Sequence, residues 1–284
     1  MGTVLLSFET ATSFLDKCQK ECQKVRGDLR TIGSIEVAGQ SDSWKRVKLF
    51  NHLSFSTLFF EQRIEFFLAC MKYEDINIDI LESLFRGLIE IYSRVLFITN
   101  FTDDEAAKKI IWQDLYLVGL SGLDFIKDPS VRGTVAIDYQ ILKSIGAEMP
   151  PIEIIQKYVQ AKLWGRGFNK DIKKIVDSYR FPGVREILSK YYEEKDIPII
   201  PRYFLYKSYS ELSEQLHGNY LMERVDPDHS GKYRVVAFLI LLALKFLKAV
   251  SKKTNSEREI DPLIEEFERF RADYLKLWRP FQLS

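Results

Sequence analysis

The chain has 284 residues, of which 46% are hydrophobic and 29% are charged, and its formal net charge at pH 7 is +1. Intrinsically disordered chains carry fewer apolar residues and more net charge, so this composition excludes disorder and predicts a folded protein of one or two domains. A net charge near zero does not indicate a nucleic-acid or membrane partner. A local basic patch remains possible, because net charge averages over all faces.

The N-terminal part of the chain predicts helices over Glu9–Arg26 and Ser43–Phe50. The polar, glycine- and serine-containing stretch from Gly33 to Ser43 between them is typical of a turn. We therefore expect residues 1–50 to form a helical appendage to a main helical domain over residues 51–284.

The cysteines are Cys18, Cys22 and Cys70, an odd number at no disulfide-framework spacing, which indicates reduced thiols. Cys18 and Cys22 are four residues apart on one predicted helix face, but two thiols without further ligands cannot form a structural zinc site. The segment Met1–Phe8 lacks the basic region and cleavage site of a secretory signal. These features predict a cytoplasmic protein with no metal and no cofactor.

The segment Asn77–Asn100 predicts a central helix, because apolar residues recur at three- and four-residue spacing in two neighbouring rows. Its polar residues fall in one stripe that includes Arg86 and Glu90. An arginine can satisfy a carboxylate and hydroxyl groups together through its fork of donors, so this stripe is a candidate contact for polar side chains from another helix.

The remaining pattern is helical throughout, and no alternation of strands and helices occurs. The sequence predicts an all-α fold, a compact irregular bundle of about ten helices. The most apolar run, Val235–Val250, is shorter than the roughly 20 residues that span a bilayer and contains two lysines, so we expect a buried core helix. The other predicted helices are Ser54–Tyr73, Asp103–Ile126, Ser130–Ile145, Ile152–Leu163, Asn169–Ser178, Val184–Glu193, Arg202–His217, Lys232–Ser251 and Ile260–Trp278.

Several catalytic motifs are absent from the sequence: the phosphate-binding loop, the dinucleotide fingerprint, the zinc-protease helix and the nucleophile elbow. The glycines of Trp164–Gly167 follow no predicted strand and indicate a turn. Glu214 and His217 form one E-x-x-H pair, whereas a di-iron bundle requires two.

The segment Tyr203–Ser230 is the most distinctive. Tyr206, Tyr209, Ser213 and His217 follow helical spacing and predict one stripe of hydroxyls, rings and an imidazole. Such polar groups on a buried face need hydrogen-bond partners, and the stripe with Arg86 and Glu90 is a candidate. Two interpretations stay open: a buried network that fixes helix register, or a ligand pocket in which His217 titrates near neutral pH. Asn219 is a candidate helix cap or ligand contact.

Arg86-Gly-Leu-Ile-Glu90, then Trp164-Gly165, and then Tyr206-Lys-Ser-Tyr209-Ser-Glu-Leu212-Ser213-Glu-Gln-Leu-His217 resemble in order and spacing an uncharacterised bacterial all-helical family. That family carries an R-x-x-x-E helix, a Trp-Gly turn and a Y-x-x-Y-x-x-L-S-x-x-x-H segment. The resemblance implies a helical fold and supports the candidate stripe, but it names no reaction.

Two other segments resemble, more distantly, the hallmark of HEPN-type helical domains: an arginine, usually followed by a polar residue, then four to six residues and a histidine. They are Arg224–His229 and Arg46–His52, and both depart from the family pattern because valine follows the arginine. The resemblance implies a HEPN-like core and a metal-independent ribonuclease, in which the arginine binds phosphate and the histidine transfers protons. His217 has no arginine at this spacing but could pair with Arg86 across helices.

Two functions follow from the sequence. The first is a non-catalytic helical interaction or sensing module in a bacterial stress or phage-defence context, packing against itself or a protein partner through an exposed helix face. The alternative is a HEPN-like ribonuclease or nucleotide-handling enzyme that uses His217 or His229 with a nearby arginine, with RNA as its partner. Neither interpretation requires a membrane.

Overall fold

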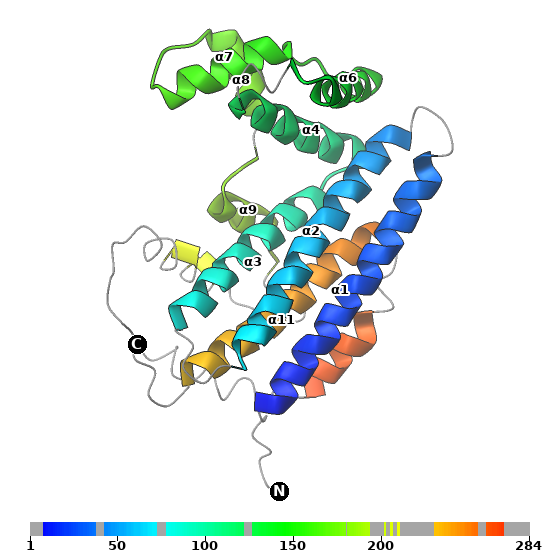
Figure 1. Ribbon diagram of the computed structural model, residues 1–284, viewed down its shortest axis with the longest axis vertical. Coiled ribbons are helices and arrows are strands. Elements are labelled where there is room, and N and C mark those ends of the chain that lie inside the picture. Colours follow the sequence, from blue (N-terminus) through cyan, green and yellow to red (C-terminus); the bar gives the residue numbers. More distant parts are fainter. Residues whose placement is uncertain are drawn as a thin grey trace, which may run out of the picture. The chain divides into compact units, whose positions relative to one another are not determined.

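The described residues form helices joined by turns, with no strand among them, and the predicted all-α fold is confirmed (Figure 1). The structure is a computed structural model. It describes residues 8–37, 43–72, 78–121, 127–179, 181–193, 202, 205–206, 209–210, 230–254 and 260–269.

The helix starts agree with the periodic segments of the sequence. Residues 260–269 are also helical. The labelled helices are α1 (Phe8–Val37), α2 (Ser43–Cys70), α3 (Ile78–Thr99), α4 (Asp103–Leu120), α6 (Pro129–Ser144), α7 (Ile152–Leu163), α8 (Lys170–Tyr179), α9 (Val184–Tyr191) and α11 (Ser230–Thr254). Helices α1 and α2 extend further than predicted, and α4 ends at Leu120, earlier than the predicted Ile126.

The chain divides into two contact units. The first contains Met1–Arg30, Leu53–Asn100 and Gly183–Ser284, and the second contains Thr31–His52 and Phe101–Pro182. The division into an appendage of residues 1–50 and a main domain of residues 51–284 stays a prediction.

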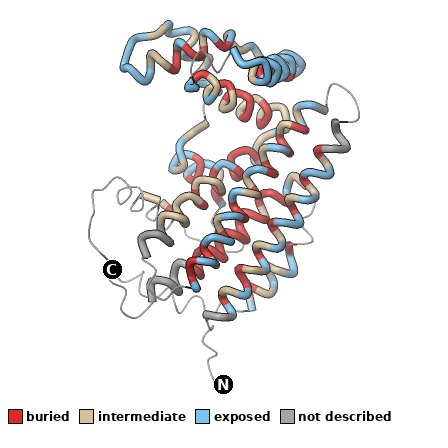
Figure 2. The backbone as a smooth tube through the Cα atoms, viewed as in Figure 1, coloured by how far each residue is buried: buried red, intermediate tan, exposed pale blue. Residues whose placement is uncertain are grey.

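The core of the first unit forms around α11, whose residues from Val236 to Leu244 are all buried (Figure 2). Helix α3 packs along α11, and the ring of Phe85 lies 6.1 Å from that of Phe238. Helix α2 contributes Phe60, which stacks on Phe246 with ring centroids 4.0 Å apart. The interpretation of the most apolar run as a core helix therefore agrees with its burial.

Helix α2 is continuous, so the expectation of separate helices over Ser43–Phe50 and Ser54–Tyr73 was wrong. Asn51 and His52, which lie between the two predicted helices, have only weak helix propensity. Leu49 and Leu53 on either side of them are fully buried, and this packing outweighs the small propensity loss.

Helix α1 also extends further than predicted, through Val37, so Gly33 lies within the helix and not at the start of a turn. A Cβ atom at Gly33 would lie 3.8 Å from Phe50 Cβ. Gly33 is therefore a point where α1 and α2 approach closely.

The second unit has its own core between α4, α6 and α7, which includes Trp112, Leu142 and Val159. The helix starts follow the expected chemistry. Thr102 caps α4 by accepting a hydrogen bond from the backbone nitrogen of Glu105, as its position three residues before a glutamate predicts.

Helix α7 ends in the predicted turn. Gly165 has a φ of +63°, its nitrogen donates to the oxygen of Lys162, and the nitrogen of Arg166 donates to the oxygen of Ala161. This pair of bonds is the Schellman ending, which requires a left-handed residue and therefore favours glycine. Leu163 and Trp164 immediately before it are 62% and 72% exposed.

Candidate functional site

The polar stripe of α3 meets Tyr209, as the sequence predicted. The Tyr209 hydroxyl donates a hydrogen bond to Glu90 Oε1 at 3.2 Å, and Arg86 Nη2 lies 3.3 Å from the same oxygen. The Arg86 guanidinium carbon also lies 5.4 Å from the centre of the Tyr209 ring. Arg86, Glu90 and Tyr209 thus form one cluster, in which the carboxylate holds both the cation and the phenol.

This cluster is accessible at its carboxylate and more enclosed at its cation. The Glu90 side chain is 36% exposed and the Arg86 side chain 21% exposed. Arg86 Nε is buried without a hydrogen-bond partner among the described residues. Arg63 of α2 approaches the neighbouring Gly87, where a Cβ atom would lie 2.9 Å from the Arg63 guanidinium carbon. The arrangement places positive charge along this part of α3.

Tyr206 belongs to a different contact. Its hydroxyl donates to the backbone oxygen of Arg185 at 3.1 Å, and its backbone oxygen accepts from Ser210 Oγ at 2.7 Å. The Arg185 guanidinium in turn donates to Ser210 Oγ. Tyr206 and Ser210 therefore hold this segment against α9, while Tyr209 alone of the two predicted tyrosines joins Arg86 and Glu90.

The other predicted site residues do not all fall in the described part of the chain. Arg46 and His52 do, and both belong to α2, where six residues turn the second side chain about 120° away from the first. Arg46 Nε lies 3.7 Å from Asp103 Oδ2, in an ion pair with α4. The candidates that lie outside the described residues are Ser213, His217, Asn219, Arg224 and His229.

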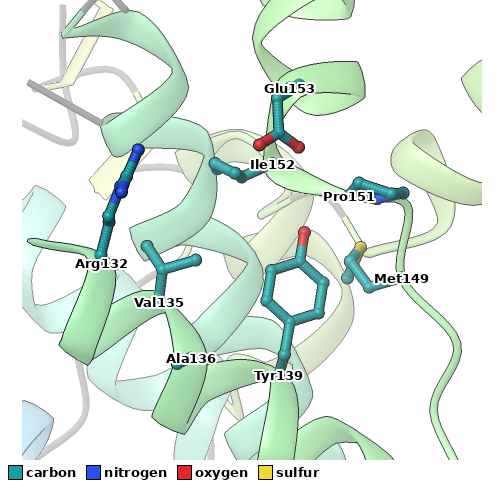
Figure 3. A pocket seen from close by; sticks show the side chains of 8 residues that line it. All are labelled: Arg132, Val135, Ala136, Tyr139, Met149, Pro151, Ile152 and Glu153. Atoms are coloured by element: carbon teal, nitrogen blue, oxygen red, sulfur yellow. The ribbon is translucent and has the colours of Figure 1, made fainter. Parts of the chain in front are cut away.

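A pocket of about 560 Å³ opens between α6 and the start of α7 (Figure 3). The hydroxyl of Tyr139 donates to the backbone oxygen of Pro150. Burial, together with the nearby carboxylates of Glu153 and Asp138, raises the pKa of this phenol. Tyr139 is therefore fixed as a protonated donor to the backbone, and the pocket lacks a tyrosine base. It is lined by Arg132, Val135, Ala136, Tyr139, Met149, Pro151, Ile152 and Glu153.

A partly buried ion cluster in the second unit was missed by sequence reasoning. Lys48 Nζ lies 2.7 Å from Asp138 Oδ1 and 2.8 Å from Asp114 Oδ2, and the Asp138 side chain is 3% exposed. Burial lowers the pKa of Lys48, but the two carboxylates outweigh it and the pKa lies above its usual range. Burial raises the pKa of Asp138 despite the lysine. The two carboxylates thus stabilise the charged form of Lys48, and Lys48 in turn stabilises the ionised form of Asp138.

No group of three or more histidine, cysteine, aspartate or glutamate side chains in the described ranges could hold a metal ion. Cys18, Cys22 and Cys70 are free and buried. Among the described helices, none is long and apolar enough to cross a membrane.

Helix α2 exposes a row of aromatic rings that sequence reasoning also missed. Phe55, Phe59 and Phe66 are 59%, 54% and 53% exposed, and their spacing of four and seven residues places them on one helix face. The opposite face carries Leu53 and Ile64, which are fully buried. We call Phe55, Phe59 and Phe66 the aromatic face of α2. Exposed and buried positions alternate along this helix in Figure 2.

Comparisons with protein-family models, with curated proteins and with solved structures found no match. The resemblances to an uncharacterised bacterial helical family and to HEPN-type domains therefore stay predictions, and so does the ribonuclease interpretation that depends on His217 or His229.

Proposed function

We propose that this chain is a non-catalytic helical interaction module that binds a protein partner, or a second copy of itself, through the aromatic face of α2. The observation that carries the proposal is the exposure of three phenylalanine rings on a helix whose opposite face is already buried. A helix that is apolar on both faces is typical of the inside of an assembly and not of its surface.

The size of the aromatic face supports a specific contact. Each ring leaves about 100 Å² in water, since a phenylalanine buries roughly 150–250 Å² when fully enclosed. The rings would therefore contribute about 300 Å² of the roughly 800 Å² that each partner buries in a stable complex. Aromatic side chains gathered at the centre of a contact surface supply much of the binding energy, so this face could act as its centre.

The position of the rings also favours an interaction role over a structural one. Within α2, Gln62 is exposed between Phe59 and Phe66, so the row of positions 55, 59, 62 and 66 carries no charge, and Arg63 and Glu65 lie on either side of it. An uncharged aromatic row at heptad-like spacing can pack against another helix by inserting its rings between the partner's side chains.

The proposal is tested by photo-crosslinking in cells, with benzoyl-phenylalanine in place of Gln62. We expect an adduct, either with the chain itself or with another protein, that disappears in the F59S/F66S background. The same probe at Lys20, an exposed position on α1, is the control for non-specific adducts.

Sedimentation velocity gives the second measurement. Self-association should weaken in the F59S/F66S variant and persist in a L117S/I137S variant, which removes two exposed hydrophobic side chains elsewhere. A strictly monomeric wild type that also forms no adduct through position 62 would overturn the proposal.

A further inference from the structure

We propose that the turn between α7 and α8 binds the surface of an anionic phospholipid bilayer, with Leu163 and Trp164 entering the interface and the surrounding basic residues contacting lipid headgroups. This surface belongs to the second unit and is separate from the aromatic face of α2, so the proposal does not rest on the proposed function.

The apolar part of the surface is unusually open. Trp164 is 72% exposed and Leu163 is 62% exposed, the highest values among the large exposed hydrophobic residues described. A Cβ atom at Gly165 or Gly167 would meet nothing within 4 Å. The turn therefore presents two adjacent apolar side chains with free space around the backbone that carries them.

The surroundings of the turn are strongly basic. Residues 157–177 contain six lysines and arginines but only two aspartates, although the whole chain has a net charge of +1. One of these aspartates, Asp177, accepts a hydrogen bond from the Tyr158 hydroxyl at 2.9 Å. The basic residues are Lys157, Lys162, Arg166, Lys170, Lys173 and Lys174, all of them exposed.

The geometry of both helices turns these charges toward solvent. Lys157 lies seven residues before Trp164, which places it on nearly the same face of α7 two turns away. On α8, Ile172 packs against the core of the second unit, whereas Lys170 and Lys174, four residues apart, share an exposed face. Like charges at this spacing destabilise an isolated helix, so a negatively charged ligand would relieve their repulsion.

The choice of lipid over nucleic acid follows from the kind of apolar residue. Proteins that bind single-stranded nucleic acid use several aromatic platforms along a groove. Here Phe168 packs edge-on against Tyr158, 5.5 Å away, and Trp164 is the exposed aromatic residue of the turn. Leucine offers no stacking surface for a base, but it partitions with tryptophan into a membrane interface, where lysine and arginine contact anionic headgroups.

This proposal departs from the expectation that no membrane is involved. That expectation followed from the length of the apolar runs and from the net charge, and peripheral binding requires neither a spanning helix nor a basic chain as a whole. A local basic patch was the possibility that the net charge left open.

The test is co-sedimentation of the full chain with vesicles of phosphatidylcholine alone, or of phosphatidylcholine with about one third phosphatidylglycerol. We expect binding to the anionic vesicles only, and weakening as salt is added. The L163S/W164S variant should bind at least roughly tenfold more weakly, because most of its apolar anchor is gone. The K170Q/K173Q/K174Q variant should lose on the order of a hundredfold, at roughly fivefold for each charge.

Matched controls separate this surface from general effects. The K20Q/K24Q/K252Q variant changes net charge by the same amount on exposed lysines of α1 and α11 and should bind like wild type. The F59S/F66S variant should also bind like wild type, so failure of the α2 proposal and failure of this one are distinguishable. Circular dichroism checks that each variant is folded.

Three results would overturn the proposal. The first is no binding of wild type to anionic vesicles at low salt, and the second is equal loss in the test and control variants. The third is tight binding of a fluorescent single-stranded RNA, lost in the same variants while vesicle binding is absent, which would assign the surface to nucleic acid.

Discussion

The ion cluster around Lys48 makes a sharp prediction about stability. Lys48→Met removes the cation that lies 2.7 Å from Asp138 Oδ1 but keeps the length and apolar stem of the side chain. Asp138 is 3% exposed, so its carboxylate would remain buried with only the second carboxylate, Asp114, beside it. Removal of one partner from a fully buried ion pair typically costs about 3–5 kcal/mol, and because the Lys48 side chain is 19% exposed we expect a loss in free energy of unfolding near the lower end of that range.

The assay is urea unfolding followed by circular dichroism, with Lys45→Met as the matched control. Lys45 pairs with Asp104 at 2.8 Å, but the two side chains are 25% and 47% exposed. Such a pair contributes about 0–1 kcal/mol, so the control variant should stay near wild type. Adding Asp138→Asn to Lys48→Met should recover part of the loss, because it removes the uncompensated charge.

The effect of Lys48→Met should depend on pH. Burial raises the pKa of Asp138 above its ordinary value of 3.8 in the folded chain, so the folded state binds this proton more tightly than the unfolded state does. The free energy of unfolding therefore falls as the pH rises from the unfolded pKa of Asp138 to its higher folded pKa. Without the lysine the folded pKa should rise further, so the fall should be larger. The destabilisation should be larger at pH 8 than at pH 5. A Lys48→Met loss within about 1 kcal/mol of the Lys45→Met loss would refute the reasoning.

Three further predictions concern other parts of the chain. Cys18 and Cys22 are fully buried, and burial raises the pKa of each thiol. Neither should therefore react with Ellman's reagent until the chain unfolds. Rapid labelling of either residue, located by mass spectrometry, would contradict their burial. Gly165→Ala should lower the free energy of unfolding by about 1 kcal/mol, because a φ of +63° strains an L-residue. Gly167→Ala should have almost no effect, and thermal unfolding of both variants followed by circular dichroism checks the difference. Tyr209→Phe should cost about 1 kcal/mol by removing its hydrogen bond to Glu90, and combination with Glu90→Gln should be less than additive in a double-mutant cycle; full additivity would mean that the contact is not made in solution.

The sequence predicted the helices well because apolar periodicity, caps and prolines act locally. Thr102 and the Trp164–Gly165 turn are examples in which a few neighbouring residues determine the backbone. The failure at Asn51–His52 has the opposite cause. Long-range burial of Leu49 and Leu53 overrides a weak local preference, and one sequence does not reveal that burial in advance.

The candidate site was predictable in part. The spacing of Tyr206 and Tyr209 indicated a shared stripe, but the hydroxyl of Tyr206 binds Arg185 and that of Tyr209 binds Glu90. The aromatic face of α2 could not be recognised, because the sequence does not distinguish an exposed phenylalanine from a buried one. The one indication in the sequence is that phenylalanines occur on both the exposed and the buried sides of α2. The pair of Lys48 and Asp138, 90 residues apart, leaves no local signal.

The order of the segments in the first unit has a consequence for synthesis. Helix α3 ends at Thr99, yet α11, which fills the core beside it, begins only at Ser230. Ribosomes add about 5–20 residues per second, so the apolar faces of α2 and α3 stay uncovered for on the order of ten seconds before α11 is synthesised. During that interval residues 101–182 emerge and can assemble the second unit's core. The nascent chain is therefore a natural client for chaperones that shield apolar helices, and truncation before α11 should yield an insoluble product.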